Sequence, residues 1–207
     1  MTTLWLSFLF AITILTLTPG FDTALVLRSA AAQGSRRAAA TALGVTTGCL
    51  AWGVAVGFGL GALLLASEVA YATLKWVGAA YLLYLGLRLL LKKPEAVAEV
   101  AVETPAQQGM FACFSRGLLG NMLNPKVGVF YVTFLPQFIP AGASVPLWCF
   151  LMALAHMAIG LVWNAVLIGG SHYFSAHLRR PAVQKVMDRL TGVVFIGFAA
   201  RLALSRH

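Results

Sequence analysis

Residues 4–32 read LWLSFLFAITILTLTPGFDTALVLRSAAA, and only Asp22 and Arg28 in this segment are charged. A helix needs about 20 predominantly apolar residues to cross a bilayer, so the segment is long enough to do so. Thr18-Pro19-Gly20 interrupts it, because proline removes a backbone donor and glycine permits the conformations that follow a break. The segment therefore predicts a membrane-spanning helix that is broken near its middle.

The composition of the whole chain agrees with this prediction. Of its 207 residues, 60% are hydrophobic and 10% are charged, whereas soluble domains carry about 45–50% apolar and about 25% charged residues. The mean hydropathy is +0.85. These values exclude a soluble enzyme, a disordered protein and a nucleic-acid-binding domain with a hydrophilic shell. We expect an all-α integral membrane protein, because a helix satisfies its own backbone hydrogen bonds in lipid.

Apolar runs separated by polar or proline-rich connections predict six transmembrane helices. The fourth is broken at Asn124-Pro125, and residues 92–108 form the only long hydrophilic stretch. The predicted spans cover approximately residues 4–32, 38–66, 70–91, 111–138, 146–174 and 188–204.

The net charge of +9 comes from 15 basic and 6 acidic residues. Eleven of the 15 basic residues lie in, or next to, the connections after the first, third and fifth spans. Because basic residues accumulate on the cytoplasmic side, this distribution predicts that both chain termini lie outside the cytoplasm. These eleven are Arg28, Arg36, Arg37, Arg88, Lys92, Lys93, Arg116, Arg179, Arg180, Lys185 and Arg189.

The two halves of the chain resemble each other. Aligning Gly78 with Gly192 matches the third and sixth spans, and aligning Pro19 with Pro125 superimposes the two breaks. Each half then holds three spans, and an odd number inverts the second half relative to the first. We expect two inverted repeats, 1–91 and 111–207, joined by a cytoplasmic linker, 92–110. Inverted repeats with paired broken helices are typical of secondary transporters.

The first break carries the first candidate binding residues. Pro19 breaks the helix, and the backbone around Thr18 and Gly20 is left with groups that a substrate or ion can satisfy. Asp22 follows within an apolar context. An acid at that depth is costly unless it is paired or hydrated, so it is a functional candidate. The alternative is that Asp22 caps the second half-helix.

The second break carries their counterparts. Asn121, Asn124, Pro125 and Lys126 lie within an otherwise apolar span. The two amides can bind a polar ligand or satisfy backbone carbonyls. Lys126 and Asp22 occupy near-equivalent positions after the two prolines. They either form an interhelical ion pair that offsets two buried charges, or grip the carboxylate and ammonium of a zwitterion.

Thr-Pro-Gly-x-Asp in the first span, Asn-Pro-Lys in the fourth and Gly44-x-x-x-Gly48 in the second resemble the LysE/RhtB family of bacterial amino-acid exporters. The resemblance covers essentially the whole chain. Phe21 departs from the family pattern, which usually has a second proline there. The resemblance implies efflux of an amino acid across the inner membrane, energised by the proton gradient. With the distribution of basic residues, an inner-membrane location predicts that both termini lie in the periplasm.

Further features leave alternatives open. His156 and Asn164 are eight residues apart near one face of the fifth span, where they line the pathway or serve in packing. Gly53-x-x-x-Gly57-x-x-x-Gly61 lets helices approach closely, within the chain or across a homodimer. We interpret the three cysteines, which are Cys49, Cys113 and Cys149, as small apolar residues within spans.

We expect no cofactor and no metal site, since no Cys/His spacing suits zinc. Two other functions were weighed against an amino-acid exporter. A metal-ion exporter needs several converging carboxylates or thiolates, but only Asp22 lies deep in a span. A membrane redox or lipid-modifying enzyme needs paired cysteines or clustered polar residues at one interface. The exporter fits the sequence best, so we expect a transporter rather than an enzyme.

Overall fold

The computed structural model of the chain describes residues 2–66, 68–91, 108–171, 173–174 and 180–204. Within these ranges, every regular element is helical. The predicted linker, 92–110, therefore lies almost entirely outside the described residues. The helices are α1 (Thr2–Leu17), α2 (Phe21–Gln33), α3 (Ser35–Ala66), α4 (Glu68–Leu91), α5 (Met110–Met122), α6 (Pro125–Phe134), the 3₁₀ helix η1 (Leu135–Phe138), α7 (Val145–Gly169) and α9 (Pro181–Leu204).

Both predicted breaks are present. Helices α1 and α2 are separated by three residues and bent by 49° relative to each other. Helices α5 and α6 are separated by Leu123 and Asn124, and Pro125 is the first residue of α6. Proline suits that position because the first amide of a helix has no partner within the helix. The first half-helix therefore ends at Met122, and the second begins at Pro125.

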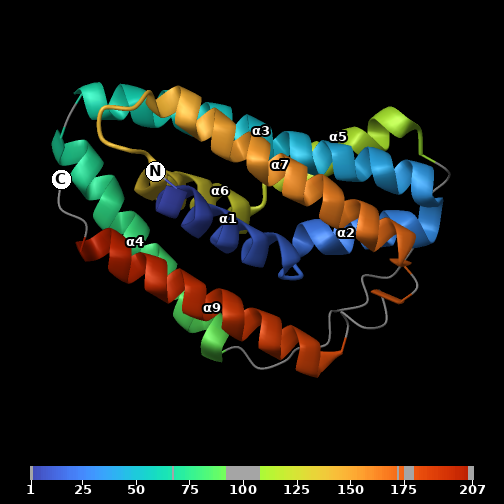
Figure 1. Cartoon of the computed structure of the whole chain (residues 1–207). Coiled ribbons are helices and arrows are strands. Elements are labelled where there is room, and N and C mark those ends of the chain that lie inside the picture. Colours follow the sequence, from blue (N-terminus) through green and yellow to red (C-terminus); the bar gives the residue numbers. More distant parts are fainter. Residues whose placement is uncertain (1, 67, 92–107, 172, 175–179, 205–207) are drawn as a thin grey trace.

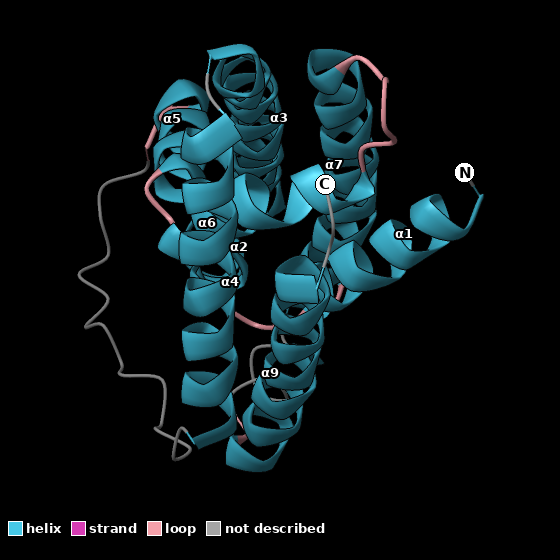
Figure 2. Ribbon diagram, turned by 90° about the vertical axis from the view of Figure 1, so that its left-hand side faces the viewer, coloured by secondary structure: helices cyan, strands magenta, loops and turns pink. Residues whose placement is uncertain are grey.

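The long helices form two antiparallel pairs on opposite sides of the molecule. Helix α3 packs against α7, and α4 packs against α9. Figure 1 shows α1 and α6 between these two pairs, and the view turned by 90° in Figure 2 again separates α3 and α7 from α9. Helix α1 begins and α9 ends at the same end of the molecule (Figure 1).

Small residues bring the backbones of α3 and its neighbours into direct contact. A Cβ atom added to Gly44 would lie 2.0 Å from the carbonyl oxygen of Phe114 on α5. One added to Gly53 would lie 2.2 Å from the Cβ of Ala153 on α7, and one added to Gly57 would lie 3.0 Å from Pro146. Gly44, Gly53 and Gly57 therefore serve packing within the chain, as one interpretation of the sequence predicts.

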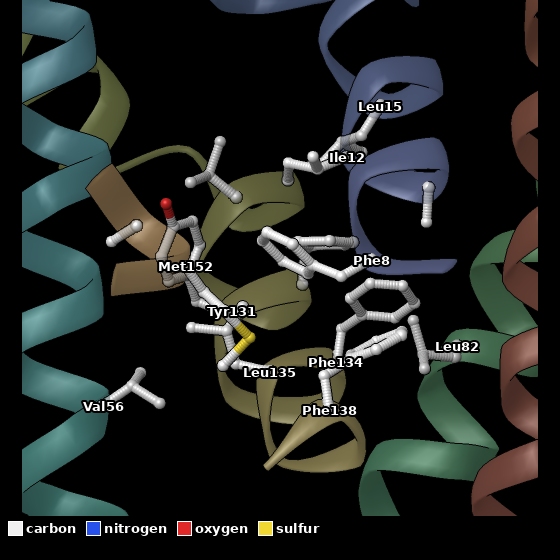
Figure 3. Packing of buried hydrophobic residues seen from close by; sticks show 14 of the residues in the cluster. Phe8, Ile12, Leu15, Val56, Leu82, Tyr131, Phe134, Leu135, Phe138 and Met152 are labelled. Carbon is white, nitrogen blue, oxygen red and sulfur yellow. The ribbon is translucent and has the colours of Figure 1, made fainter. Parts of the chain in front are cut away.

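Aromatic side chains fill the core between α1, α6 and the two helix pairs (Figure 3). Phe134 lies 4.2 Å, centroid to centroid, from Phe130 and 4.1 Å from Phe198. Phe8 of α1 packs edge-on against Phe138 at 5.6 Å. Edge-on and offset arrangements of this kind add about 0.5–1.5 kcal/mol per pair beyond burial. This core holds the first half of α1 against the second broken helix.

The helix lengths match the predicted spans only in part. By length and composition, α7 and the Ser35–Gly59 part of α3 are each long and apolar enough to cross a membrane. The bent pair α1 and α2 is also long and apolar enough when its two helices are taken as one span. Two ends differ from the prediction. Helix α7 stops at Gly169 rather than near Phe174, and α9 begins at Pro181 rather than at Asp188. Proline is favoured in the first turn of a helix, so Pro181 starts α9 within a segment predicted to be a connection.

Candidate functional site

The first break spans Thr18, Pro19 and Gly20, between the end of α1 and the start of α2. The amide and hydroxyl of Thr18 both donate to the carbonyl oxygen of Ile14, at 3.0 and 2.7 Å. Pro19 follows without a donor, and Gly20, in an extended conformation, precedes the first residue of α2. The hydroxyl of Thr18 also hydrogen-bonds to the hydroxyl of Thr191, so α9 closes one side of the break.

The second break is closed by a side-chain cap. The Oδ1 atom of Asn124 accepts a hydrogen bond of 3.1 Å from the backbone amide of Lys126 and so caps α6. Asparagine is a favoured residue at this position, because its oxygen satisfies an amide that has no partner within the helix. Asn124 therefore fixes the start of the helix that carries Lys126.

The two breaks meet in space. The ammonium nitrogen of Lys126 lies 3.4 Å from the carbonyl oxygen of Thr18, to which it donates. The Oδ2 atom of Asp22 accepts a hydrogen bond of 2.8 Å from the amide of Asn121. In the described part of the chain, Asp22 and Lys126 form no direct ion pair, since each charged group contacts the opposite broken helix elsewhere. The capping alternative for Asp22 is also absent, because Gly20 is the N-cap of α2.

A cavity of about 70 Å³ lies where the breaks meet. Its wall includes most of the residues singled out from the sequence and adds several apolar ones. Among the described residues, no group of three or more His, Cys, Asp or Glu side chains lies close enough to hold a metal ion. The cavity is lined by Leu15, Thr16, Thr18, Gly20, Phe21, Asp22, Thr23, Val45, Thr46, Cys49, Asn124, Lys126, Val127, His156, Gly160, Trp163 and Asn164.

The cavity wall holds polar atoms that no other described residue satisfies. The buried Oδ1 atom of Asp22 and the buried indole N–H of Trp163 have no hydrogen-bond partner among the described residues. Leaving a buried polar atom unpaired costs about 1–3 kcal/mol. An acceptor and a donor thus remain for a ligand, in addition to the ammonium of Lys126.

Asn121 is not part of the cavity wall. It lies behind Asp22, and its amide also lies 3.5 Å from the sulfur of Cys49. A Cβ atom added to Gly48 would lie 2.6 Å from Oδ1 of Asn121, so this glycine leaves the room that the amide occupies. Asn121 therefore hydrogen-bonds the carboxylate of Asp22 from outside the cavity wall, and its predicted contact with a ligand stays a prediction.

His156 and Asn164 both line the cavity and both are buried. The Nδ1 atom of His156 forms a hydrogen bond of 2.8 Å with the hydroxyl of Tyr131 on α6, and the two rings stack 5.7 Å apart. This contact satisfies part of the histidine and ties α7 to the second broken helix. The two alternatives for His156, pathway and packing, are therefore both compatible with its place.

The cysteines are buried and free, as predicted. Two of them also contact amide side chains. Cys49 accepts from Asn121, and the sulfur of Cys113 lies 3.2 Å from Oε1 of Gln33. The cavity wall also contains Thr46, Gly160 and Trp163, which were not predicted from the sequence. A usable signal was present for the last two, since residues 156, 160, 163 and 164 recur at helical spacing on one face.

Similar proteins cover nearly the full chain. A homoserine/homoserine lactone efflux protein of Salmonella typhi is 30% identical over 204 residues, which are 98% of this chain and 97% of the relative. A leucine efflux protein of Klebsiella pneumoniae subsp. pneumoniae is 31% identical over 204 residues, or 96% and 94% of the two chains. An uncharacterized membrane protein of Bacillus subtilis is 29% identical over 90% of this chain and 92% of its own length. No solved structure matches the chain.

The family assignment follows from a match along almost all of the sequence. The profile of the LysE type translocators matches residues 13–206, which include both breaks and every cavity residue. The apolar helices and the efflux relatives agree with it. The chain thus belongs to the LysE type translocator family and is a multi-pass membrane transporter, not an enzyme.

Proposed function

We propose that this protein exports zwitterionic amino acids, or close derivatives of them, across the bacterial inner membrane by proton-coupled secondary transport. One observation carries the proposal. Asp22 and Lys126 line a single cavity at the junction of two broken helices, and in the described part of the chain the two groups form no direct ion pair. A zwitterion needs such a pair of separate, opposite charges.

The geometry gives each end of the substrate a partner. The ammonium of an amino acid matches the unpaired Oδ1 atom of Asp22, and its carboxylate matches the ammonium of Lys126. Helices α2 and α6 both begin at the cavity, because their N-cap residues Gly20 and Asn124 line it. Helix N-termini favour anions, so they add to the attraction for the carboxylate.

The relatives narrow the class of substrate. Two are named for the efflux of homoserine, homoserine lactone and leucine, whose side chains are uncharged. The cavity of this chain has one acidic and one basic side chain, and the remaining wall is mostly apolar or hydroxyl-bearing. We therefore propose neutral amino acids as substrates, with one charged partner for each end of the backbone.

The transmembrane arrangement is part of the same proposal. Six spans form two inverted repeats, 1–91 and 111–207, with breaks in the first span of each. Three features support it: the two antiparallel pairs α3/α7 and α4/α9, the paired breaks, and the common end at which α1 begins and α9 ends. The positive-inside distribution of basic residues supports a periplasmic position for that end.

We propose Asp22 as the group that couples export to protons. Its carboxylate lies on the cavity wall with one oxygen unpaired. An acid within a membrane span is a common proton carrier in transporters. Protonation would release the substrate ammonium, and this links proton entry to substrate exit.

The test uses the purified full chain in lipid vesicles. Vesicles are loaded with labelled homoserine, leucine, lysine or glutamate, and export is measured with and without an imposed proton gradient. We expect gradient-stimulated export of homoserine or leucine above that of lysine and glutamate. An equal rate of export with and without the gradient would overturn proton coupling. Export of a divalent cation, with no export of any of the four amino acids, would overturn the proposed substrate class.

A further inference from the structure

Helix α7 presents one continuous face to the cavity. His156, Gly160, Trp163 and Asn164 all line it, and their spacing of four, three and one residues places them on one side of a helix. Three of the four carry large or polar side chains. The fourth position, Gly160, leaves a gap in the middle of that face.

Gly160 differs from the glycines that pack helices together. A Cβ atom added to Gly44 or Gly53 would fall within 2.2 Å of a neighbouring helix, so these positions have no room for a side chain. A Cβ atom added to Gly160 would meet only the Cγ2 methyl of Thr46, at 3.1 Å. No backbone atom lies within 4 Å of such a Cβ, so its only close neighbour is a side chain that also lines the cavity.

Glycine inside a helix costs about 0.5–1 kcal/mol relative to alanine, so the open position needs a reason other than helix stability. The wall around it is apolar or hydroxyl-bearing, with Val45, Thr46 and Val127 among the lining residues. The cavity is only about 70 Å³, while ligand sites commonly span about 300–1,000 Å³. In so small a site, one methyl group is a large part of the space.

We propose that Gly160 and Thr46 form the wall that receives the side chain of the exported amino acid and that they limit its size. This inference rests on the proposed function, because Asp22 and Lys126 are taken to hold the backbone ends of the substrate. Gly160 is then a specificity-determining position. Its missing side chain admits substrates of the size of leucine.

The experiment compares export of leucine with export of homoserine from vesicles containing the full chain. Gly160→Ala adds one methyl to the wall. We expect kcat/KM for leucine to fall at least about 10-fold relative to that for homoserine, since one methylene in a tight pocket changes discrimination about 10–200-fold. Gly169→Ala is the matched control, because it lies on the same helix, outside the cavity, with nothing within 4 Å of an added Cβ.

A second substitution tests the contact itself. Thr46→Ser removes the Cγ2 methyl that the new Cβ would meet, and serine keeps the hydroxyl that donates to the carbonyl oxygen of Ala42 at 3.0 Å. We expect Gly160→Ala combined with Thr46→Ser to recover most of the lost leucine export. A structural defect of Gly160→Ala elsewhere would not respond to this change.

The outcomes separate the inference from the function on which it rests. Equal leucine-to-homoserine ratios in Gly160→Ala, Gly169→Ala and the unmodified protein would overturn the size limit and leave the proposed function standing. A uniform loss of both substrates in Gly160→Ala, with no recovery by Thr46→Ser, would overturn it as well. An unmodified protein that exports neither amino acid would overturn the proposed function and the inference together.

Discussion

The carboxylate of Asp22 on α2 accepts a hydrogen bond of 2.8 Å from the side-chain amide of Asn121 on α5. The bond joins the two broken helices and uses one carboxylate oxygen, while the other stays buried without a partner among the described residues. Asn121 thereby orients the acid without covering it. Asn121 thus holds Asp22 through Oδ2, while Oδ1 remains for a ligand.

Exchanging the two side chains distinguishes positioning from binding. Asn121→Asp places an acceptor against an acceptor, so we expect a lower melting temperature and little export, because a hydrogen bond to a charged group contributes about 1.5–3 kcal/mol. Asp22→Asn combined with Asn121→Asp restores a donor–acceptor pair but moves the carboxylate out of the cavity wall. We expect the melting temperature to recover and export to stay low. Recovery of both would show that the carboxylate is only structural.

Removing both charges of the cavity tests the zwitterion site. If Asp22 and Lys126 merely neutralised each other, each single variant would leave an unpaired buried charge at a cost of about 3–5 kcal/mol. Asp22→Asn with Lys126→Gln would then restore both melting temperature and export. We expect the double variant to fold and to export at under about a tenth of the normal rate, because both ends of the substrate lose their partners. Export at the normal rate would end the assignment of both residues.

The contact between α3 and α5 predicts a sharp difference between two glycines of one helix. Gly44→Ala would push a methyl group into the carbonyl oxygen of Phe114, whereas Gly59→Ala meets nothing within 4 Å. We expect Gly44→Ala to lower the melting temperature by several degrees and reduce export, since overpacking costs about 1–3 kcal/mol. Gly59→Ala should be neutral or slightly stabilising. Thermal unfolding in detergent compares the two, and equal melting temperatures would contradict the packing described here.

The hydroxyl of Tyr131 supports His156 from the second broken helix. Tyr131→Phe keeps the stacked ring and removes only the hydrogen bond, which leaves a buried imidazole nitrogen unpaired. We expect a loss of about 1–3 kcal/mol in stability. Tyr84→Phe serves as the control, because Tyr84 is 54% exposed on α4. The melting temperatures of the two variants check the prediction, which fails if Tyr131→Phe melts no lower than Tyr84→Phe.

The proposed topology predicts the compartment of the C-terminus and of the 92–107 segment. A reporter that is active only in the periplasm, fused after His207, should be active, and the same reporter placed in the 92–107 segment should be silent. A cytoplasm-only reporter should give the reverse pattern at both sites. Activity of the cytoplasmic reporter after His207 would contradict the six-span arrangement and the inversion of the second half.

The sequence predicted the breaks and the charged pair because both are local signals. Proline and glycine interrupt a helix wherever they stand, and a charge within an apolar run is conspicuous without any structure. Asp22 and Lys126 could therefore be picked out, and the structure places both on one cavity wall. Their contacts could not be predicted, since partners such as Asn121 and the carbonyl of Thr18 depend on how α2, α5 and α6 cross.

The remaining cavity residues could not be predicted from their amino-acid type alone. Trp163, Thr46 and Gly160 resemble ordinary packing residues of apolar helices. Helical spacing groups Gly160 and Trp163 with His156 on one face of α7, but only the helix arrangement shows that this face lines the cavity. The start of α9 was missed for a similar reason. A basic, proline-containing segment is typical of a connection, yet Pro181 is well suited to the first turn of a helix.

The close approach of α3 and α5 also constrains how the family can evolve. Added Cβ atoms at Gly44 and Gly117 would strike backbone carbonyls, of Phe114 and Thr41, at 2.0 and 2.1 Å. No replacement of a neighbouring side chain relieves a clash with the backbone, so no second substitution can compensate for a larger residue at either position. An added Cβ at Gly128, by contrast, would strike the ring of Trp52 at 2.7 Å. Sequences that keep this packing should retain glycine at 44 and 117, while a larger residue at 128 should arise together with a smaller one at 52.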